Sequence, residues 1–164
     1  MQIGEGFAGT APDLAHVNTV LGRRDGPAGA AFATALASPS VGHTPFLVVV
    51  RPGLAAQPPT LFVNKAAIAG DRHGTLTWGA AQAGVAAGVA AALADGTIPV
   101  DEVAELVLLA AVWVDPAAGD EGAVFENNRV ATAAALAAGA AGDPPVADVL
   151  AAGADPWNPS FRPR

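Results

Sequence analysis

The chain has 164 residues, of which 52% are hydrophobic and 14% are charged, so it can bury a core and is not intrinsically disordered. A formal net charge of −7 leaves no basic face, so we expect no nucleic-acid partner and no anionic-membrane partner. The chain has no cysteine, which excludes disulfides, thiolate nucleophiles and thiolate metal sites.

Much of the apolar content is alanine and only 5% of the residues are aromatic. Small side chains bury little area each, so the core must depend on close backbone approach. A chain of this kind often buries further apolar surface against copies of itself. The N-terminal residues lack the basic and apolar regions of a signal peptide, and the apolar runs are shorter than the roughly 20 residues of a membrane span. We therefore expect a cytoplasmic protein with one domain over residues 1–164.

The N-terminal half predicts three strands and one helix. Residues 14–23 alternate between two faces, with His16 and Asn18 on the same face. Asp25 is a candidate N-cap for a helix that contains Pro27 in its first turn and ends near residue 38. The β-branched and aromatic run 44–51 predicts a buried strand, and residues 60–67 predict a further strand.

The C-terminal half predicts a further, strongly apolar strand and two long helices. Residues 79–94 are helical by alanine content, and residues 106–114 form the apolar strand. Residues 121–138 predict the second long helix, and 146–151 a short one. Gly84 and Gly88 share a face of the first helix, which indicates a close packing contact. Strands that alternate with long helices predict a mixed sheet covered by helices.

Common catalytic motifs fail on their context. The segment from Gly4 to Gly9 matches the dinucleotide-binding pattern G-x-G-x-x-G, but only three residues precede it and Pro12 blocks the helix that should follow. The three histidines are widely separated, so a metal site is not expected. Neither a phosphate-binding loop nor a nucleophile elbow occurs. Motifs therefore support neither hydrolases nor hydride-transfer enzymes.

Two polar features remain. His16 and Asn18 project from one strand face near its start, where a cleft could reach them. Lys65 is the only lysine among eight basic residues, and a compact ammonium at a strand end suggests a role that a planar guanidinium would not fill. An isolated histidine or lysine of this kind is nevertheless more often a hydrogen-bonded or solvated surface residue.

Several segments in the same order resemble the formaldehyde-activating enzymes over nearly the whole chain. They are Ile3-Gly4-Glu5 with Leu14-Ala15-His16-Val17-Asn18, then Gly42-His43-Thr44-Pro45-Phe46-Leu47, Pro59-Thr60-Leu61 with Asn64-Lys65, Gly79-Ala80-Ala81-Gln82, Ala94 to Pro99, and Ala131-Thr132. The resemblance implies an α+β two-layer sandwich like the second domain of ribosomal protein S5. It further implies a homo-oligomer, namely a homopentamer with the active site between neighbouring subunits.

The implied reaction joins formaldehyde to tetrahydromethanopterin, a reduced pterin, and gives the methylene derivative and water. Within the resemblance, His16 corresponds to the proton donor and Leu47, Lys65 and Gln82 to retained substrate-binding residues. Two further binding positions differ from the family, which has aspartate where this chain has Asn18 and threonine where it has Ala67. The pterin is a co-substrate, and no permanently bound cofactor or metal is implied.

The chemistry suits a histidine. Loss of hydroxide from the carbinolamine needs a proton, and an imidazole with an ordinary pKa of roughly 6.5 can deliver it near neutral pH. Asparagine supplies no negative charge, so the sequence predicts that His16 holds its proton less firmly than it would beside aspartate. Two alternatives stay open: a non-catalytic pterin-binding or formaldehyde-sensing homologue, and a related condensation with tetrahydrofolate.

Overall fold

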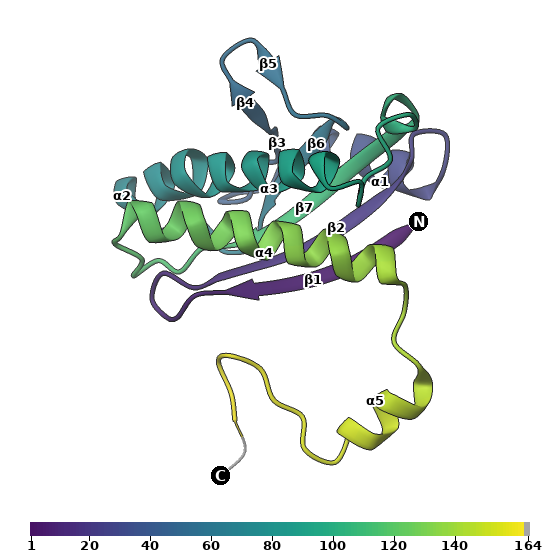
Figure 1. Ribbon diagram of the computed structural model, residues 1–164. Coiled ribbons are helices and arrows are strands. Elements are labelled where there is room, and N and C mark those ends of the chain that lie inside the picture. The colour runs from purple at the N-terminus through teal and green to yellow at the C-terminus, as the bar shows by residue number, and fades with distance from the viewer. Residues whose placement is uncertain (163–164) are drawn as a thin grey trace.

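A computed structural model describes residues 1–162 and shows a five-stranded mixed sheet with the order β1-β2-β7-β6-β3 (Figure 1). Its strands are β1 (Gln2–Ala8), β2 (Ala15–Arg23), β7 (Leu106–Trp113), β6 (Thr60–Asn64) and β3 (Phe46–Leu47). Strand β2 is antiparallel to both β1 and β7, whereas β6 is parallel to β7. A small hairpin, β4 (Val49–Arg51) and β5 (Leu54–Ala55), follows the edge strand β3.

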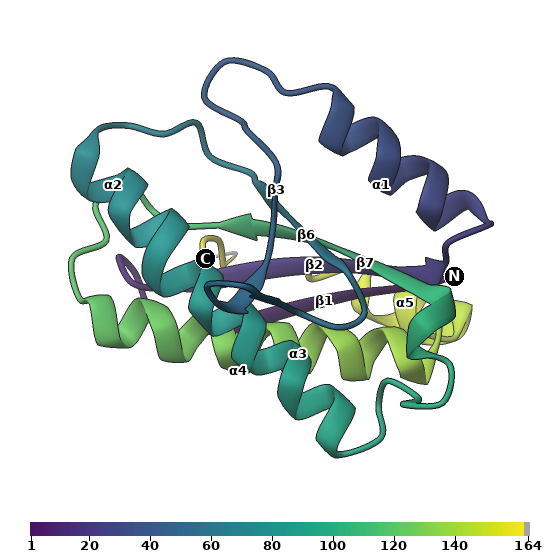
Figure 2. The same cartoon turned by 90° about the horizontal axis from the view of Figure 1, so that it is seen from above.

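Helices lie on both faces of this sheet. The long helices α3 (Gln82–Ala94) and α4 (Glu121–Ala141) pack side by side on one face, and α1 (Pro27–Ala37) lies on the other (Figure 2). The short α2 (Asp71–Thr75) and the π-helical turn η1 (Leu76–Ala81) lead directly into α3, and the turn η2 (Val103–Glu105) precedes β7. Helix α5 (Val146–Ala152) stands away from the body (Figure 1). The α+β class is confirmed.

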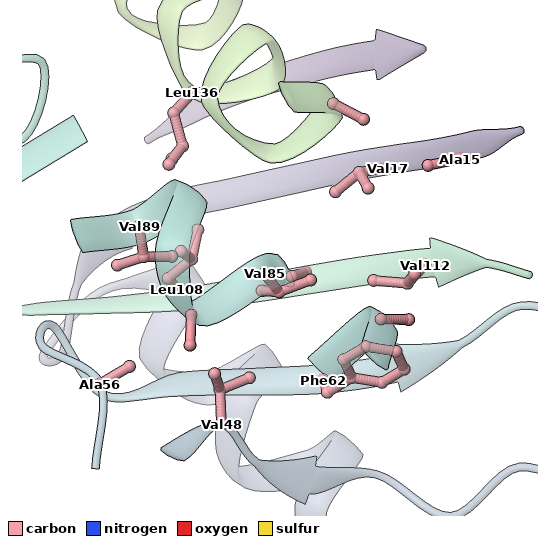
Figure 3. Packing of buried hydrophobic residues seen from close by; sticks show 14 of the residues in the cluster. Ala15, Val17, Val48, Ala56, Phe62, Val85, Val89, Leu108, Val112 and Leu136 are labelled. Carbon is pink, nitrogen blue, oxygen red and sulfur yellow. The ribbon is translucent and has the colours of Figure 1, made fainter. Parts of the chain in front are cut away.

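The core lies between the sheet and the α3–α4 layer. Val17 of β2, Leu108 of β7 and Phe62 of β6 point toward these helices and are fully buried (Figure 3). Val85 of α3 and Leu136 of α4 meet them from the other side. Because alternate residues of β2 enter this core, His16 and Asn18 are left on the opposite face, as the sequence alternation predicts.

Glycines allow the backbones to approach as closely as the alanine-rich composition requires. A Cβ added at Gly4 or Gly6 of β1 would lie only 1.8 or 2.1 Å from a carbonyl oxygen of α4. A Cβ added at Gly84 or Gly88 of α3 would lie 2.4 or 2.7 Å from a carbonyl oxygen of α4, which confirms the predicted packing role. Gly4 and Gly6 of the G-x-G pattern therefore lie within strand β1, which packs closely against α4, and not in a nucleotide-binding turn.

Two predicted strands differ in extent, and two strands were not predicted. The segment 44–51 is not one buried strand, because it breaks into β3 and β4 and only Val48 within it is buried. Its edge position leaves Leu47 half exposed, and edge position cannot be read from composition. Strand β6 ends at Asn64 rather than at Ala67. Strand β1, rich in glycine, and the two-residue strand β5 were missed.

The predicted helix limits agree with the structure more closely than the strand limits do, except at the start of the run that leads into α3. The first helix begins after Gly26, and Asp25 pairs with Arg23 instead of capping the helix. Helix α4 extends three residues beyond the predicted end, and α5 matches its prediction within one residue. The helical run before α3 starts at Asp71, eight residues earlier than predicted.

The continuous run Asp71–Ala94 is long and apolar enough to cross a membrane by length and composition, contrary to the shorter runs expected from the sequence. However, 61% of its apolar window is buried inside the body. It packs against α4, and several of its residues belong to the core. The run is therefore a central core helix of this fold.

Candidate functional site

The site lies on the sheet face opposite α3 and α4, toward the end of β2 that α1 does not cover. Helix α1 packs over the other end, where an added Cβ at Gly22 would lie 2.9 Å from the Ala28 side chain. At the open end the His16 side chain keeps 27% of its surface accessible. His16 is therefore accessible from the part of this face that α1 leaves open.

A carboxylate from the neighbouring strand holds His16. The β1–β2 register places Phe7 opposite His16 and Glu5 opposite Asn18. His16 Nε2 donates to Glu5 Oε1 at 2.8 Å, and the Phe7 ring stacks on the imidazole with centroids 3.9 Å apart. Sequence reasoning missed Glu5 as a site residue. The alternation of Glu5 and Phe7 with two glycines was the available signal.

Lys65 reaches the same cluster from β6. Its Nζ donates to Asn18 Oδ1 at 2.8 Å, and Asn18 Nδ2 donates weakly to Glu5 Oε1 at 3.4 Å. Strand β7 lies between β6 and β2, and it carries the small Ala111 opposite Asn18. The structure therefore brings three predicted residues, His16, Asn18 and Lys65, into one hydrogen-bonded cluster with Glu5.

The charges of this cluster act on one another. Partial burial lowers the pKa of His16 below its ordinary value of 6.5, the hydrogen bond to Glu5 opposes that change, and the positive charge of Lys65 adds to it. Burial also lowers the pKa of Lys65 to about 8, with Glu5 opposing. His16 therefore holds its proton less firmly than an ordinary imidazole, and the predicted comparison with an aspartate at position 18 stays a prediction. The main cause is burial, and a carboxylate from β1 partly replaces the charge that Asn18 lacks.

His16 and Glu5 of this cluster line a cavity of about 590 Å³. Glu5, Phe7 and His16 line one side of the cavity, which we call its floor, and the C-terminal segment 157–160 lines the opposite side. Trp157 of this segment and Phe161 directly after it are exposed, and α5 ahead of the segment stands off the body (Figure 1). The cavity is of the size that takes small organic ligands.

Leu47 and Gln82 line a different cavity, of about 460 Å³, together with Phe46, Val49 and Trp78. Gln82 Oε1 accepts the backbone N–H of Val49 at 2.6 Å, and this bond fixes the break between β3 and β4. Strands β6 and β7 separate β3 from β2, so Leu47 lies three strand spacings, roughly 14 Å, across the sheet from His16. Within one chain, the structure does not bring these two residues to the His16 cluster.

The remaining predicted position and the other histidines lie elsewhere. Ala67 is exposed, packs beside Gly42, and lines neither of these two cavities. His43 contacts the carbonyl of Asn64, whereas His73 is buried with both ring nitrogens bonded to backbone. Over residues 1–162, no three His, Asp or Glu side chains form a metal-binding group.

Comparison with known proteins identifies relatives over most of the chain. The sequence model of the family "Formaldehyde-activating enzyme (Fae)" matches residues 3–159. The chain is 38% identical to "5,6,7,8-tetrahydromethanopterin hydro-lyase" of Methanosarcina barkeri, over 91% of this chain and 84% of that protein. It is 41% identical to "Bifunctional enzyme Fae/Hps" of Methanococcoides burtonii, over 92% of this chain. The chain spans 38% of the length of that bifunctional relative.

Proposed function

The chain belongs to the formaldehyde-activating enzyme family, as its sequence motifs predict, and we propose that it condenses formaldehyde with tetrahydromethanopterin and releases water. The observation that carries this proposal is the partly exposed His16, held by Glu5 at the floor of a cavity. The reaction is a carbon–oxygen lyase reaction with the reduced pterin as co-substrate.

The protein's chemical task is to remove the hydroxyl of the carbinolamine. An amine adds to formaldehyde readily once the two are positioned, but hydroxide is a poor leaving group until it is protonated. Because Glu5 accepts the Nε2 proton of His16, that proton stays in place and fixes the ring. The imidazolium's second proton, on Nδ1, is then the one passed to the departing hydroxyl. The Glu5 carboxylate offsets the positive charge of the imidazolium before this transfer and keeps the ring oriented.

The stacked Phe7 ring contributes orientation. It covers one face of the imidazole, so the ring cannot turn without losing that contact. Asn18 and Lys65 lie beside Glu5 on the same sheet face and offer hydrogen bonds to the polar edge of a pterin. Ala67 offers no such group, and one hydrogen bond expected for the family is absent.

A second copy of the chain completes the site in this proposal, and the assembly is a homopentamer. Leu47 and Gln82 correspond to pterin-binding positions but lie across the sheet from His16 in their own chain. The surface around them is apolar and exposed, with Leu47, Val50 and Trp78 all about half accessible. A neighbouring subunit would bring this surface against the His16 cavity and bury it.

The function is tested by mixing the purified protein with formaldehyde and tetrahydromethanopterin, and separately with tetrahydrofolate. We expect the methylene product to form faster than in the uncatalysed mixture with tetrahydromethanopterin. Acceleration with tetrahydrofolate alone would instead support the related condensation. Binding of the pterin without acceleration in either mixture would support the non-catalytic homologue and overturn the proposal.

The shared site is tested by complementation between two inactive variants, His16→Ala and Leu47→Asp. After subunit exchange, followed by native mass spectrometry, some interfaces combine an intact His16 with an intact Leu47. We expect these mixed oligomers to recover part of the activity. No recovery despite complete exchange would show that each site is built within one chain.

A further inference from the structure

Lys65 occupies an unusual chemical position for a residue that only binds substrate. It is the only lysine of the chain, and its Nζ hydrogen-bonds to the neutral amide of Asn18. Glu5 and His16 are the titratable groups whose charges couple to it across the sheet face. Glu5 is already engaged by His16 at 2.8 Å. No carboxylate in residues 1–162 forms an ion pair with the Lys65 ammonium.

These surroundings favour the neutral amine. Partial burial lowers the pKa of Lys65 to about 8, and the amide of Asn18 does not hold the charge as an aspartate would. About a tenth of the molecules then carry an uncharged amine at pH 7, against well under a thousandth for a lysine of ordinary pKa. A neutral lysine amine is a strong nucleophile toward carbonyl carbon.

We propose that Lys65 captures formaldehyde covalently and passes its carbon to the pterin. The Nζ lone pair bonds to the aldehyde carbon, and the carbonyl oxygen takes up the proton that Nζ loses, which gives a carbinolamine. The imidazolium of His16 protonates the hydroxyl, the carbon–oxygen bond breaks, and water leaves a methylene iminium on Nζ. This inference rests on the proposed function, because it concerns the route by which the same site activates formaldehyde.

Transfer then restores the enzyme. The first amine of the pterin adds to the iminium carbon, and a proton moves from that amine to Nζ. The carbon–Nζ bond then breaks and its electron pair stays on Nζ, while the lone pair of the pterin nitrogen forms a methylene iminium on the pterin. The second pterin amine closes the ring and loses a proton, which returns to His16. The net reaction is still one formaldehyde and one pterin giving the methylene derivative and one water, with no oxidant or reductant consumed.

The placement of Lys65 suits this route. His16 hydrogen-bonds to Glu5, Lys65 hydrogen-bonds to Asn18, and Asn18 contacts Glu5, so the amine and the proton donor border one patch of the sheet face. A carbon bound at Nζ would therefore be held near the acid that must remove its hydroxyl. Holding a reactant beside its catalytic group is a large source of rate enhancement.

The single lysine makes the test direct. The protein is treated near pH 7 with formaldehyde and cyanoborohydride, without pterin, and the site that gains a reduced methylene is located by peptide mass spectrometry. An Arg51→Lys variant supplies an exposed comparison lysine in the same chain, because Arg51 lies at the exposed end of β4. We expect Lys65 to be labelled more than roughly ten-fold faster than this added lysine. Equal or slower labelling of Lys65 would overturn the inference.

A second arm separates the inference from the function on which it rests. Lys65→Arg keeps a positive charge and a hydrogen-bond donor for Asn18 but has no comparable nucleophilic amine. We expect its acceleration of the pterin condensation to fall at least roughly ten-fold, with the thermal melt confirming a folded protein. Full acceleration in this variant would reject capture by Lys65 and leave the proposed function standing. Rapid labelling of Lys65 in a protein that accelerates no pterin condensation would instead reject the function.

Discussion

The contact between β1 and α4 gives the sharpest prediction about how the site is built. Gly4→Ala would place a Cβ 1.8 Å from the carbonyl oxygen of Ala135 and 2.8 Å from the backbone nitrogen of Gly139. Both neighbours are helix backbone and cannot turn aside as a side chain could. The strand or the helix must therefore retreat by at least about 1 Å, which loosens the packing along the whole β1–α4 contact. Overpacking of this kind costs up to ~3 kcal/mol and more where nothing can yield.

Chemical and thermal unfolding measure this cost. For a chain of this length, a loss of about 3 kcal/mol lowers the melting temperature by about 6–12 °C. The matched control is Gly119→Ala, where an added Cβ meets nothing within 4 Å and the backbone is not left-handed. We expect the control to change stability by less than about 1 kcal/mol. If the free energy of unfolding of Gly4→Ala lies within about 1 kcal/mol of that of the control, the close approach is not what fixes β1 on the helix.

Three further variants test the site. Glu5→Gln removes the carboxylate that raises the pKa of His16, so we expect its NMR titration and the pH profile of the rate to move to lower pH; an unmoved profile would count against this pair. Asn18→Asp adds a negative charge on the same face, so the profile should move to higher pH, and no movement would refute the coupling. Gln82→Leu leaves the Val49 N–H without its acceptor, and we expect a loss of about 1–2 kcal/mol in urea unfolding; unchanged stability would mean that solvent replaces the bond.

The sequence predicted the central part of the fold for an identifiable reason. Residues 14–23 alternate strictly, and one alternate set is apolar enough to belong to the core, so the outward face of His16 and Asn18 could be assigned. The strands at the edges of the sheet could not be predicted in this way. β1 is held by the close approach of α4 to Gly4 and Gly6, and a strand stabilised in this way has no propensity signal of its own.

The site was predicted only as far as single residues. Strand alternation and the single lysine singled out His16, Asn18 and Lys65, and the family resemblance gave them roles. The contact of Lys65 with the other two depends on the order of β2, β7 and β6 in the sheet. Glu5 was missed because its contact with His16 arises from strand pairing, which sequence spacing does not show. The missed carboxylate also changes the electrostatic interpretation, since β1 supplies a negative charge that the sequence analysis considered absent.

The central claim is that His16 donates the proton that releases water, and the most direct measurement is the pH dependence of formaldehyde condensation in the wild type and in His16→Ala. We expect the wild-type rate above the spontaneous reaction to fall as pH rises through the His16 pKa, which partial burial lowers below its ordinary value. In His16→Ala the acceleration should drop by about 100-fold or more, the range for loss of a general acid. A variant that keeps the wild-type rate and pH profile would contradict the account.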